Sequence, residues 1–265
     1  MSAGTYVFSD TNQEQEWKRL TAIQDQFDPA TRRRLSGLGL GSGWSCLEVG
    51  PGAGSIMRWM CKSVGLSGQV VAVDINPRFV VIDELPNLEV RCLDIAQTGV
   101  EADSFDLVHA RYVLLHIHES KNALLNMVRA LKPGGWLVLE EPDFATGMPA
   151  NGDAADWQAV IRVNEAIGRM YSSMGIDPFM GRKLPSLFQE LNLNRITVET
   201  EVPLSNGGSG MAKIMQMSVE HLRQRLLDTG IPSPEDINRY IHLADAPTAW
   251  AMYYATVAVW GQKPS

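Results

Sequence analysis

CLEVGPGAGS, residues 46–55, is a short apolar run followed by three glycines at alternate positions, Gly50, Gly52 and Gly54. Apolar residues return directly afterwards, in the segment 56–60, at the spacing of a helix. Glycine adopts backbone conformations that other residues avoid, and it lets the backbone approach a ligand closely. A helix that begins after such a turn presents its first N–H groups to that ligand. The stretch therefore predicts a strand, a nucleotide-type binding turn and a helix.

Short apolar runs and helical patterns alternate around this stretch. The predicted strands are 45–49, 69–73, 88–93, 105–110 and 136–140, and the predicted helices between them are 54–64, 77–84 and 120–131. The strands are hydrophobic along most of their length, as expected of a sheet covered on both faces. The alternation predicts an α/β fold, a doubly wound and mostly parallel Rossmann-like sheet.

The alternation of strand and helix patterns does not continue on either side of this core. Before it, the pattern predicts a helix over 10–27 and a second helix beginning at Asp28-Pro29. After it we expect helices over 153–174, 182–191, 211–228 and 234–243, strands over 195–203 and 250–260, and a flexible link at 205–210. We expect a single domain over 1–265, made of a helical arm (1–43), a cofactor-binding core (44–147), helical cap insertions (148–190 and 205–247) and closing strands (191–204 and 248–265).

Charge and cysteine content limit the partners. The net charge of −7 disfavours nucleic acid and anionic membranes, and the basic run 32–34 is interpreted as a solvated helix face. Cys46, Cys61 and Cys92 form no CxxC pair and lie in apolar segments, which favours buried, reduced thiols and no metal site. No signal-like or membrane-spanning apolar stretch is present, so we expect a cytoplasmic protein.

Acidic residues at the ends of the first three strands narrow the choice of ligand. A dinucleotide fingerprint would place glycine where this chain has Ser55, and Glu48 would repel a pyrophosphate but favour a cationic ligand. Asp74 ends the second strand, where a carboxylate can accept hydrogen bonds from both ribose hydroxyls. Asp94 follows the third strand and could accept from an adenine amino group, with Ile75 and Ile95 beside the ring.

Together these motifs resemble the class I S-adenosylmethionine-dependent methyltransferases. The resemblance covers about residues 45–140 and rests on EVGPGAG, VAVDINP, CLDI, FDLVHARYVLLHI and LKPGGWLVLEE, in that order. It implies a seven-stranded sheet whose last strand is antiparallel, with S-adenosylmethionine across the carboxyl ends of the strands. The implied cofactor contacts are Glu48, Gly50, Gly52, Gly54, Asp74, Ile75, Asp94, Ile95, Ala110 and Arg111. The subgroup it looks most similar to is the ubiquinone and menaquinone type of small-molecule methyltransferases.

Catalytic residues are harder to predict, because methyl transfer needs a base only when the acceptor must lose a proton. His116 is the preferred candidate, beside His118, Glu141 and Asp143 at the same predicted sheet edge, although a supporting, hydrogen-bonded role is favoured over a catalytic one for His116. His109 lies inside the fourth strand and is interpreted as structural. For Arg111, a structural ion pair and a cofactor contact stay open.

The sequence gives only weak indications of the methyl acceptor. His109-Ala110-Arg111-Tyr112 stands where enzymes that methylate base amino groups carry Asn/Asp-Pro-Pro-aromatic. Eight of the 12 methionines lie between 148 and 252, which suits an adaptable lid for a bulky, partly apolar small molecule as well as ordinary core packing. The alternatives are a fold relative with a non-methylating reaction, or a non-catalytic binding or scaffold protein.

Overall fold

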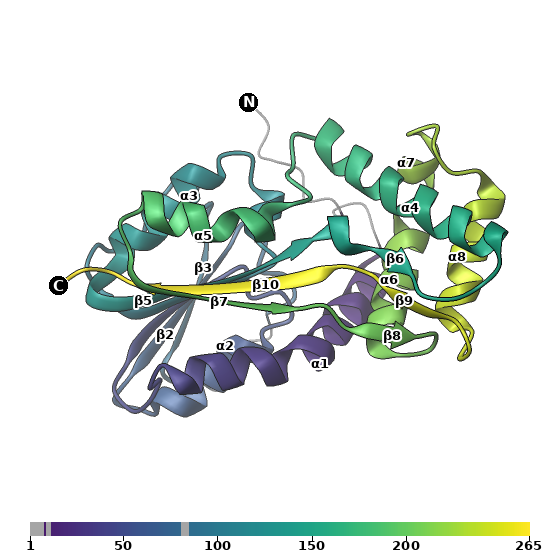
Figure 1. The fold of residues 1–265 in the computed structure, drawn as a ribbon. Coiled ribbons are helices and arrows are strands. Elements are labelled where there is room, and N and C mark those ends of the chain that lie inside the picture. The colour runs from purple at the N-terminus through teal and green to yellow at the C-terminus, as the bar shows by residue number, and fades with distance from the viewer. Residues whose placement is uncertain (1–7, 9–11, 81–84) are drawn as a thin grey trace. The chain divides into compact units, whose positions relative to one another are not determined.

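A seven-stranded sheet forms the centre of the computed structural model, which describes residue 8 and residues 12–80 and 85–265 (Figure 1). Its strands, in sheet order, are β3 (Leu88–Cys92), β2 (Gln69–Asp74), β1 (Ser45–Val49), β4 (Phe105–Arg111), β5 (Leu131–Asp143), β10 (Ala255–Gln262) and β7 (Asn194–Glu201). β1 pairs in parallel with β2 and β4, and β2–β3 and β4–β5 are also parallel. The predicted mostly parallel sheet is confirmed.

The strand next to β5 runs in the opposite direction. Lys263, just beyond β10, exchanges backbone hydrogen bonds of 2.9 Å with Gly134 and Gly135 near the start of β5. The end of one strand therefore lies beside the beginning of the other, as in an antiparallel pair. This agrees with the antiparallel last strand that the resemblance implied.

Helices cover both faces of the sheet. The carboxyl-terminal half of α1 (Gln13–Gly37) and α2 (Ser55–Val64) lie on one face, and α3 (Ser120–Ala130) and α5 (Met180–Glu190) lie on the other (Figure 1). Leu35, Met57 and Met60 pack with alternate strand residues in one buried cluster. This double covering explains why most residues of the central strands are apolar and buried.

The predicted helix break at Asp28-Pro29 is wrong, because α1 continues through Pro29 to Gly37. Proline lacks the N–H that would bond the carbonyl oxygen of Asp25, and its ring crowds that carbonyl group. Asp28 does not cap a new helix; its carboxylate accepts hydrogen bonds from Arg32 and Arg111, each at 2.9 Å. Hydrogen bonds of the Asp28 side chain to Arg32 within α1 and to Arg111 on β4 therefore outweigh the local tendency of this pair to end a helix.

The chain divides into two compact units, which we describe separately. The core unit comprises 27–141, 182–199 and 258–265, and holds most of the sheet. The second unit comprises 1–26, 142–181 and 200–257. It contains most of the two segments that we predicted as cap insertions, whereas α5, predicted within the first insertion, belongs to the core unit.

The second unit contains a sheet that the sequence did not indicate. β6 (Met148–Pro149), β9 (Trp250–Met252) and β8 (Leu204–Asn206) form three antiparallel strands. Two predictions are therefore wrong: 250–260 forms two strands in different sheets, and the predicted flexible link begins inside β8. Gly207 then lies so close to Ala246 that an added Cβ would come within 2.1 Å of its carbonyl oxygen.

Four helices of the second unit lie between these strands along the chain. They are α4 (Ala154–Ser173), α6 (Gly210–His221), α7 (Arg223–Leu227) and α8 (Pro234–Asp245). Asp153 and Ser233 open α4 and α8 with capping boxes, and Pro234 occupies the first turn of α8 as predicted. The single helix predicted over 211–228 is interrupted at Leu222.

Two shorter elements follow the core strands, namely the 3₁₀ helices η1 (Leu114–His116) and η2 (Phe144–Thr146). The helix predicted over 77–84 is not seen in its described part, where Val80 N–H bonds the carbonyl of Pro77 in a turn; residues 81–84 lie outside the described ranges. Across the described ranges, no helix combines the length and hydropathy that a membrane crossing requires.

Candidate cofactor site

The glycine turn occupies the carboxyl end of β1, as predicted. Gly50, Gly52 and Gly54 all have positive φ values of 67°, 57° and 83°, and α2 begins at the next residue. Residues with side chains adopt this left-handed conformation only at an energetic penalty, so the glycines have a conformational reason to be here. Because β1 to β5 are parallel, the same edge of the sheet holds the residues that follow each of these strands.

Close packing also explains two of these glycines. A Cβ atom on Gly50 would lie 2.4 Å from Cγ2 of Val113, which follows β4, and one on Gly54 would lie 3.0 Å from atoms of Met57 and Arg58. Arg58 itself donates a 2.7 Å hydrogen bond to the carbonyl of Ala53 and so braces the turn. The turn is thus held between α2 and the segment after β4.

Ser55, at the start of α2, carries an unsatisfied polar group. Its Oγ atom is buried and finds no hydrogen-bond partner within the described part of the chain. Buried hydroxyl groups normally have a partner, which can be a ligand. The sequence singled out Ser55 only as the residue that spoils a dinucleotide fingerprint.

Asp74 and Asp94 both lie at the carboxyl edge of the sheet, at the end of β2 and just after β3, and their side chains form similar local hydrogen bonds. Oδ1 of Asp74 accepts from the N–H of Asn76 at 2.7 Å, and Oδ1 of Asp94 accepts from the N–H of Ala96 at 2.9 Å. Burial raises the pKa of Asp74, partly offset by that backbone bond and by Arg78. Each carboxylate retains a second oxygen that can accept a hydrogen bond from a ligand.

The two isoleucines beside these acids differ from each other. Ile75 is exposed, with 49% of its surface accessible, whereas Ile95 is buried at 4%. Only Ile75 therefore presents an accessible apolar side chain next to the acids. The carbonyl of Ile95 is engaged by the side-chain amide of Asn126 at 2.8 Å.

Glu48 lies in a different environment from the one predicted. Its carboxylate is buried and its Oε2 lies 2.7 Å from Nδ1 of His109, directly across the β1–β4 pair. Glu48 and Glu140 raise the pKa of His109 to about 9 against the opposing effect of burial, so the imidazole is protonated at neutral pH. The structural interpretation of His109 is confirmed, and its partner is the acid that we predicted to face the ligand.

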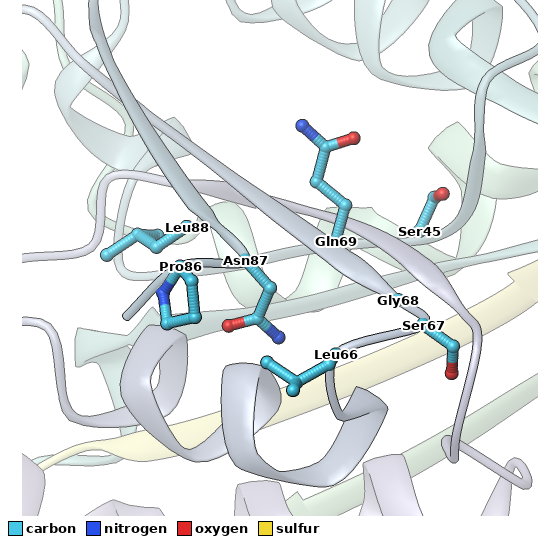
Figure 2. Close-up of a pocket in the computed structure, with 8 residues that line it drawn as sticks. All are labelled: Ser45, Leu66, Ser67, Gly68, Gln69, Pro86, Asn87 and Leu88. Carbon is cyan, nitrogen blue, oxygen red and sulfur yellow. The ribbon is translucent and has the colours of Figure 1, made fainter. Parts of the chain in front are cut away.

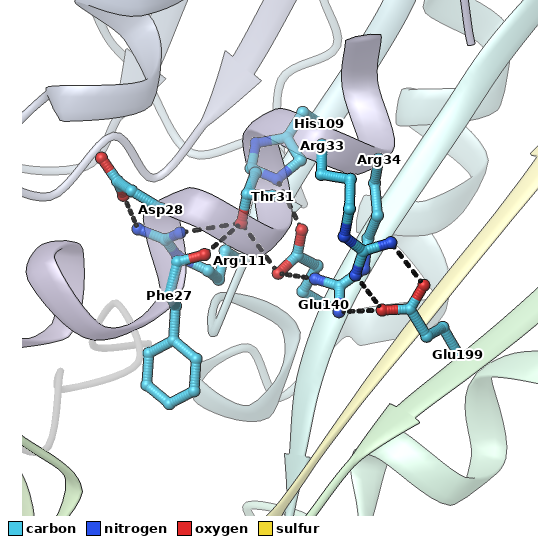
Figure 3. Close-up of polar contacts among 9 residues, drawn as sticks. All are labelled: Phe27, Asp28, Thr31, Arg33, Arg34, His109, Arg111, Glu140 and Glu199. Carbon is cyan, nitrogen blue, oxygen red and sulfur yellow. Dashed lines mark hydrogen bonds and ion pairs between the residues drawn. The ribbon is translucent and has the colours of Figure 1, made fainter. Parts of the chain in front are cut away.

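His109 belongs to a larger buried network between the sheet and α1 (Figure 3). Its Nε2 lies 3.7 Å from Oε1 of Glu140, while Oε2 of Glu140 accepts from Thr31 at 3.0 Å and from Arg34 at 3.1 Å. Arg34 also donates to Glu199 on β7 at 2.8 Å. The basic run 32–34 is therefore only partly a solvated face: Arg34 is buried, and Arg33 is exposed.

Arg111 donates from its side chain to α1. Its guanidinium group donates to Oδ1 of Asp28 and to Oγ1 of Thr31, each at 2.9 Å (Figure 3). The ion-pair interpretation of this side chain is the one seen, and the backbone remains the part that borders the edge. Ala110, one residue earlier in β4, is completely buried.

The predicted catalytic candidates follow β4 and β5. His116 ends η1 and is half-buried, His118 is exposed, and Glu141 is completely buried. Asp143 is buried as well, and its side chain accepts from the N–H of Ala145 at 3.0 Å. Glu141 is not placed to contact solvent, and its partners are backbone N–H groups of the segment that carries His116.

A pocket at the opposite edge of the sheet is a different feature (Figure 2). It is lined by Ser45, Leu66, Ser67, Gly68, Gln69, Pro86, Asn87 and Leu88. Ser45, Gln69 and Leu88 begin β1, β2 and β3, so the pocket lies at the amino ends of these strands. None of the predicted site residues lines it.

Comparison with known proteins shows which family residues 47–139 match. The profile of a family described as a methyltransferase domain matches residues 47–139. Methyltransferase str2 of Strobilurus tenacellus is 29% identical over 198 residues, which cover 72% of this chain and 69% of that protein. The ubiquinone/menaquinone biosynthesis C-methyltransferase UbiE of Laribacter hongkongensis is 33% identical over 142 residues, covering 51% of this chain and 58% of that protein. The chain therefore carries a methyltransferase domain, and its similarity to these enzymes supports a class I S-adenosylmethionine-dependent methyltransferase.

The fold of this methyltransferase is also found in solved structures. Phosphoethanolamine N-methyltransferase 2 of Haemonchus contortus, in complex with S-adenosylhomocysteine, superposes with a TM-score of 0.64 at 16% identity. All of this chain and 61% of the nematode enzyme are covered. A second structure of that enzyme is in complex with S-adenosyl-L-methionine.

Residues at the carboxyl edge fit this cofactor. Gly50 and Gly52 of the left-handed turn are only partly buried, and Asp74 and Asp94 each keep a carboxylate oxygen that can accept a hydrogen bond, as predicted contacts to ribose and adenine require. The unsatisfied hydroxyl of Ser55 is a further polar group at the same turn. Sequence reasoning missed Ser55 as a candidate, although its position at the start of α2 was a usable signal.

Proposed function

We propose that this methyltransferase methylates a small organic molecule that is bulky and partly apolar. The net charge of −7 disfavours nucleic acid as the acceptor. The UbiE relatives are named for ubiquinone and menaquinone biosynthesis, and the nematode enzyme was solved with phosphomonomethylethanolamine. Those names describe other proteins, but all of their acceptors are small molecules.

The composition of the second unit's interior carries this proposal. Phe144 stacks with Tyr171 at a ring-centroid distance of 5.5 Å and lies 5.1 Å from Tyr254. The hydroxyl of Tyr240 and the side-chain amide nitrogen of Asn164 are buried and have no hydrogen-bond partner among the described residues. Aromatic side chains near a few unsatisfied polar groups suit contact with a ligand that is mainly apolar and has polar substituents. We assign acceptor recognition to this unit, in keeping with the predicted helical cap.

The cofactor contacts that we propose come from the core unit. The glycine turn would contact the methionine part of S-adenosylmethionine, Asp74 the ribose, and Asp94 and Ile75 the adenine. The backbone at Ala110 and Arg111 would border the methionine part. Ile95 can contribute mainly through its backbone, since its side chain is buried. Glu48 would act from beneath the turn through its charge.

His116 remains our candidate for a base. It ends η1 at the cofactor edge and is half-buried, so its imidazole can be reached from a neighbouring site. If the acceptor must lose a proton, His116→Ala should slow turnover and leave cofactor affinity unchanged. Wild-type turnover by this variant, measured with an identified acceptor, would remove His116 from the reaction.

Labelled methyl transfer tests the acceptor class. The protein is incubated with S-adenosylmethionine that carries a labelled methyl group, and with pools of small aromatic, quinone-like and amine compounds, or with RNA, DNA or denatured protein. We expect label in a small-molecule product, together with stoichiometric S-adenosylhomocysteine. Label only in the nucleic acid or protein fraction would overturn the proposed acceptor class.

A further inference from the structure

The acidic residue after Glu140 on β5 has an unusual set of partners. Glu141 is completely buried, and its carboxyl oxygens accept hydrogen bonds from three successive backbone N–H groups. The donors are Val113 at 2.9 Å, Leu114 at 2.7 Å and Leu115 at 3.3 Å. These residues form the segment that leaves β4 and opens η1.

That segment contains a strained residue. Tyr112 has a φ of 58°, a left-handed conformation that an aromatic residue rarely adopts. Its N–H bonds the carbonyl of Glu140 at 2.8 Å, and its ring packs edge-on against Phe27 at 5.3 Å. Strain of this kind persists only where the surroundings fix the backbone. Here, the next three N–H groups are fixed by one side chain.

The fixed segment meets the glycine turn. Val113, whose N–H bonds Glu141, is also the residue whose Cγ2 would lie 2.4 Å from a Cβ on Gly50. The chain of contacts therefore runs from β5 through the segment after β4 to the turn that follows β1. In addition, the N–H of His116 bonds the carbonyl of Val113 at 2.9 Å, so the same segment sets the backbone position of His116.

We propose that Glu141 is a positioning residue of the cofactor site, which holds residues 112–115 in the conformation that supports the glycine turn. Burial is unfavourable for this carboxyl group, and it raises its pKa to about 8 in spite of the three backbone bonds. A leucine would fill the same interior without that penalty, but it would leave three buried N–H groups without an acceptor. Glu141 therefore acts through Val113 on Gly50 and does not itself touch the cofactor.

Cofactor affinity of folded variants tests this assignment. Glu141→Met keeps the length of the side chain and removes the acceptor, and it should weaken S-adenosylhomocysteine binding, measured by calorimetry, by at least about tenfold. Glu141→Gln keeps one oxygen for the N–H groups of Val113 and Leu114, and should restore affinity to within about threefold of wild type. If Glu141→Met does not fold, Glu141→Asp, which is too short to reach all three donors, replaces it with the same expected loss.

Asn87 offers a matched control at the other edge of the sheet. Its side chain also holds a loop through backbone bonds, donating to the carbonyl groups of Cys61 and Gly65 at 2.9 Å each. Asn87→Ala should lower the melting temperature and leave S-adenosylhomocysteine affinity unchanged. Wild-type affinity in Glu141→Met, or in Glu141→Asp where the first does not fold, would overturn the assignment. So would an equal loss of affinity in Asn87→Ala, since binding would then simply follow stability.

Discussion

At the scale of single residues, the most informative group is the His109 imidazolium between two buried carboxylates. Its pKa of about 9 in the folded protein stands above the ordinary value of 6.5. A raised pKa means that the folded state holds the proton more tightly than the unfolded chain does. The resulting stability is fully present below pH 6.5 and is lost as the pH rises through about 9.

We therefore expect the free energy of unfolding to fall between pH 6.5 and 9, by about 3 kcal/mol from this group alone. His109→Gln should be less stable at pH 7 and should show a flatter dependence in this interval. Urea denaturation at a series of pH values measures both curves. Parallel curves for the wild type and the variant would show that His109 does not carry the charge.

Asp74 gives a second prediction at this scale. Asp74→Ala should weaken binding of S-adenosylmethionine and S-adenosylhomocysteine by roughly 30- to 150-fold, about 2–3 kcal/mol, through lost charge-assisted hydrogen bonds. Asp103→Asn, which changes an exposed acid paired with Lys263, is the control and should bind as wild type. Calorimetric titration of both variants decides the matter, and an unchanged affinity in Asp74→Ala would exclude it from the ribose contact.

At the scale of elements, the glycine turn requires glycine for two reasons, the left-handed backbone conformation and the close approach of a neighbouring side chain, and these can be tested separately. Gly50 needs both a left-handed φ of 67° and space beside Val113, whereas Gly39 has a φ of 90° and no atom within 4 Å of an added Cβ. Gly39→Ala should therefore lose only the conformational part, about 1–2 kcal/mol of stability. Gly50→Ala should lose more stability and also weaken cofactor binding, because the turn must shift away from Val113.

Thermal unfolding and S-adenosylhomocysteine titration of both alanine variants measure these losses. If Gly50→Ala and Gly39→Ala are destabilised equally and both bind the cofactor normally, the contact with Val113 is not important for the turn.

Elements with a strong local pattern were predicted well from the sequence, and the failures have physical causes. The first four core strands and α2 match because their periodicity and glycine signals agree with their burial, and the fifth, predicted over 136–140, lies within the longer β5 (Leu131–Asp143). Pro29 misled the prediction, since α1 continues through it and Asp28 instead forms ion pairs with Arg32 in the same helix and with Arg111 on β4. The apolar run 250–260 could not reveal that its two halves join different sheets, because pairing is a property of distant residues.

In the candidate site too, features set by local sequence were predicted and contacts between distant residues were not. Motif spacing predicted which residues gather at the carboxyl edge of the sheet, and the parallel strands bring them there. It could not predict that Glu48 faces His109, because that pair spans two strands far apart in sequence. Cys92, predicted to be buried, is exposed, since β3 is an edge strand of the sheet. Cys46 and Cys61 are buried as predicted.

At the scale of the whole molecule, the two units should respond differently to the cofactor. Our assignment places its contacts in the core unit, at 50–54, 74–76 and 112–116. Hydrogen exchange with saturating S-adenosylhomocysteine should therefore slow most in these segments, and less in α4 and α8 of the second unit. At a ligand concentration about 100 times Kd, mass action should raise the free energy of unfolding by about 2.7 kcal/mol. Protection centred on α4 and α8 would contradict the assignment.

The central claim, that this chain is an S-adenosylmethionine-dependent methyltransferase, is tested most directly by calorimetric titration of the wild-type protein. S-adenosylhomocysteine, S-adenosylmethionine and NADH are titrated in turn. We predict micromolar binding of the first two and no binding of NADH, because the glycine turn and its acids favour a cationic, ribose-bearing ligand over a pyrophosphate. Tight binding of NADH with no heat from S-adenosylmethionine or S-adenosylhomocysteine would contradict the account.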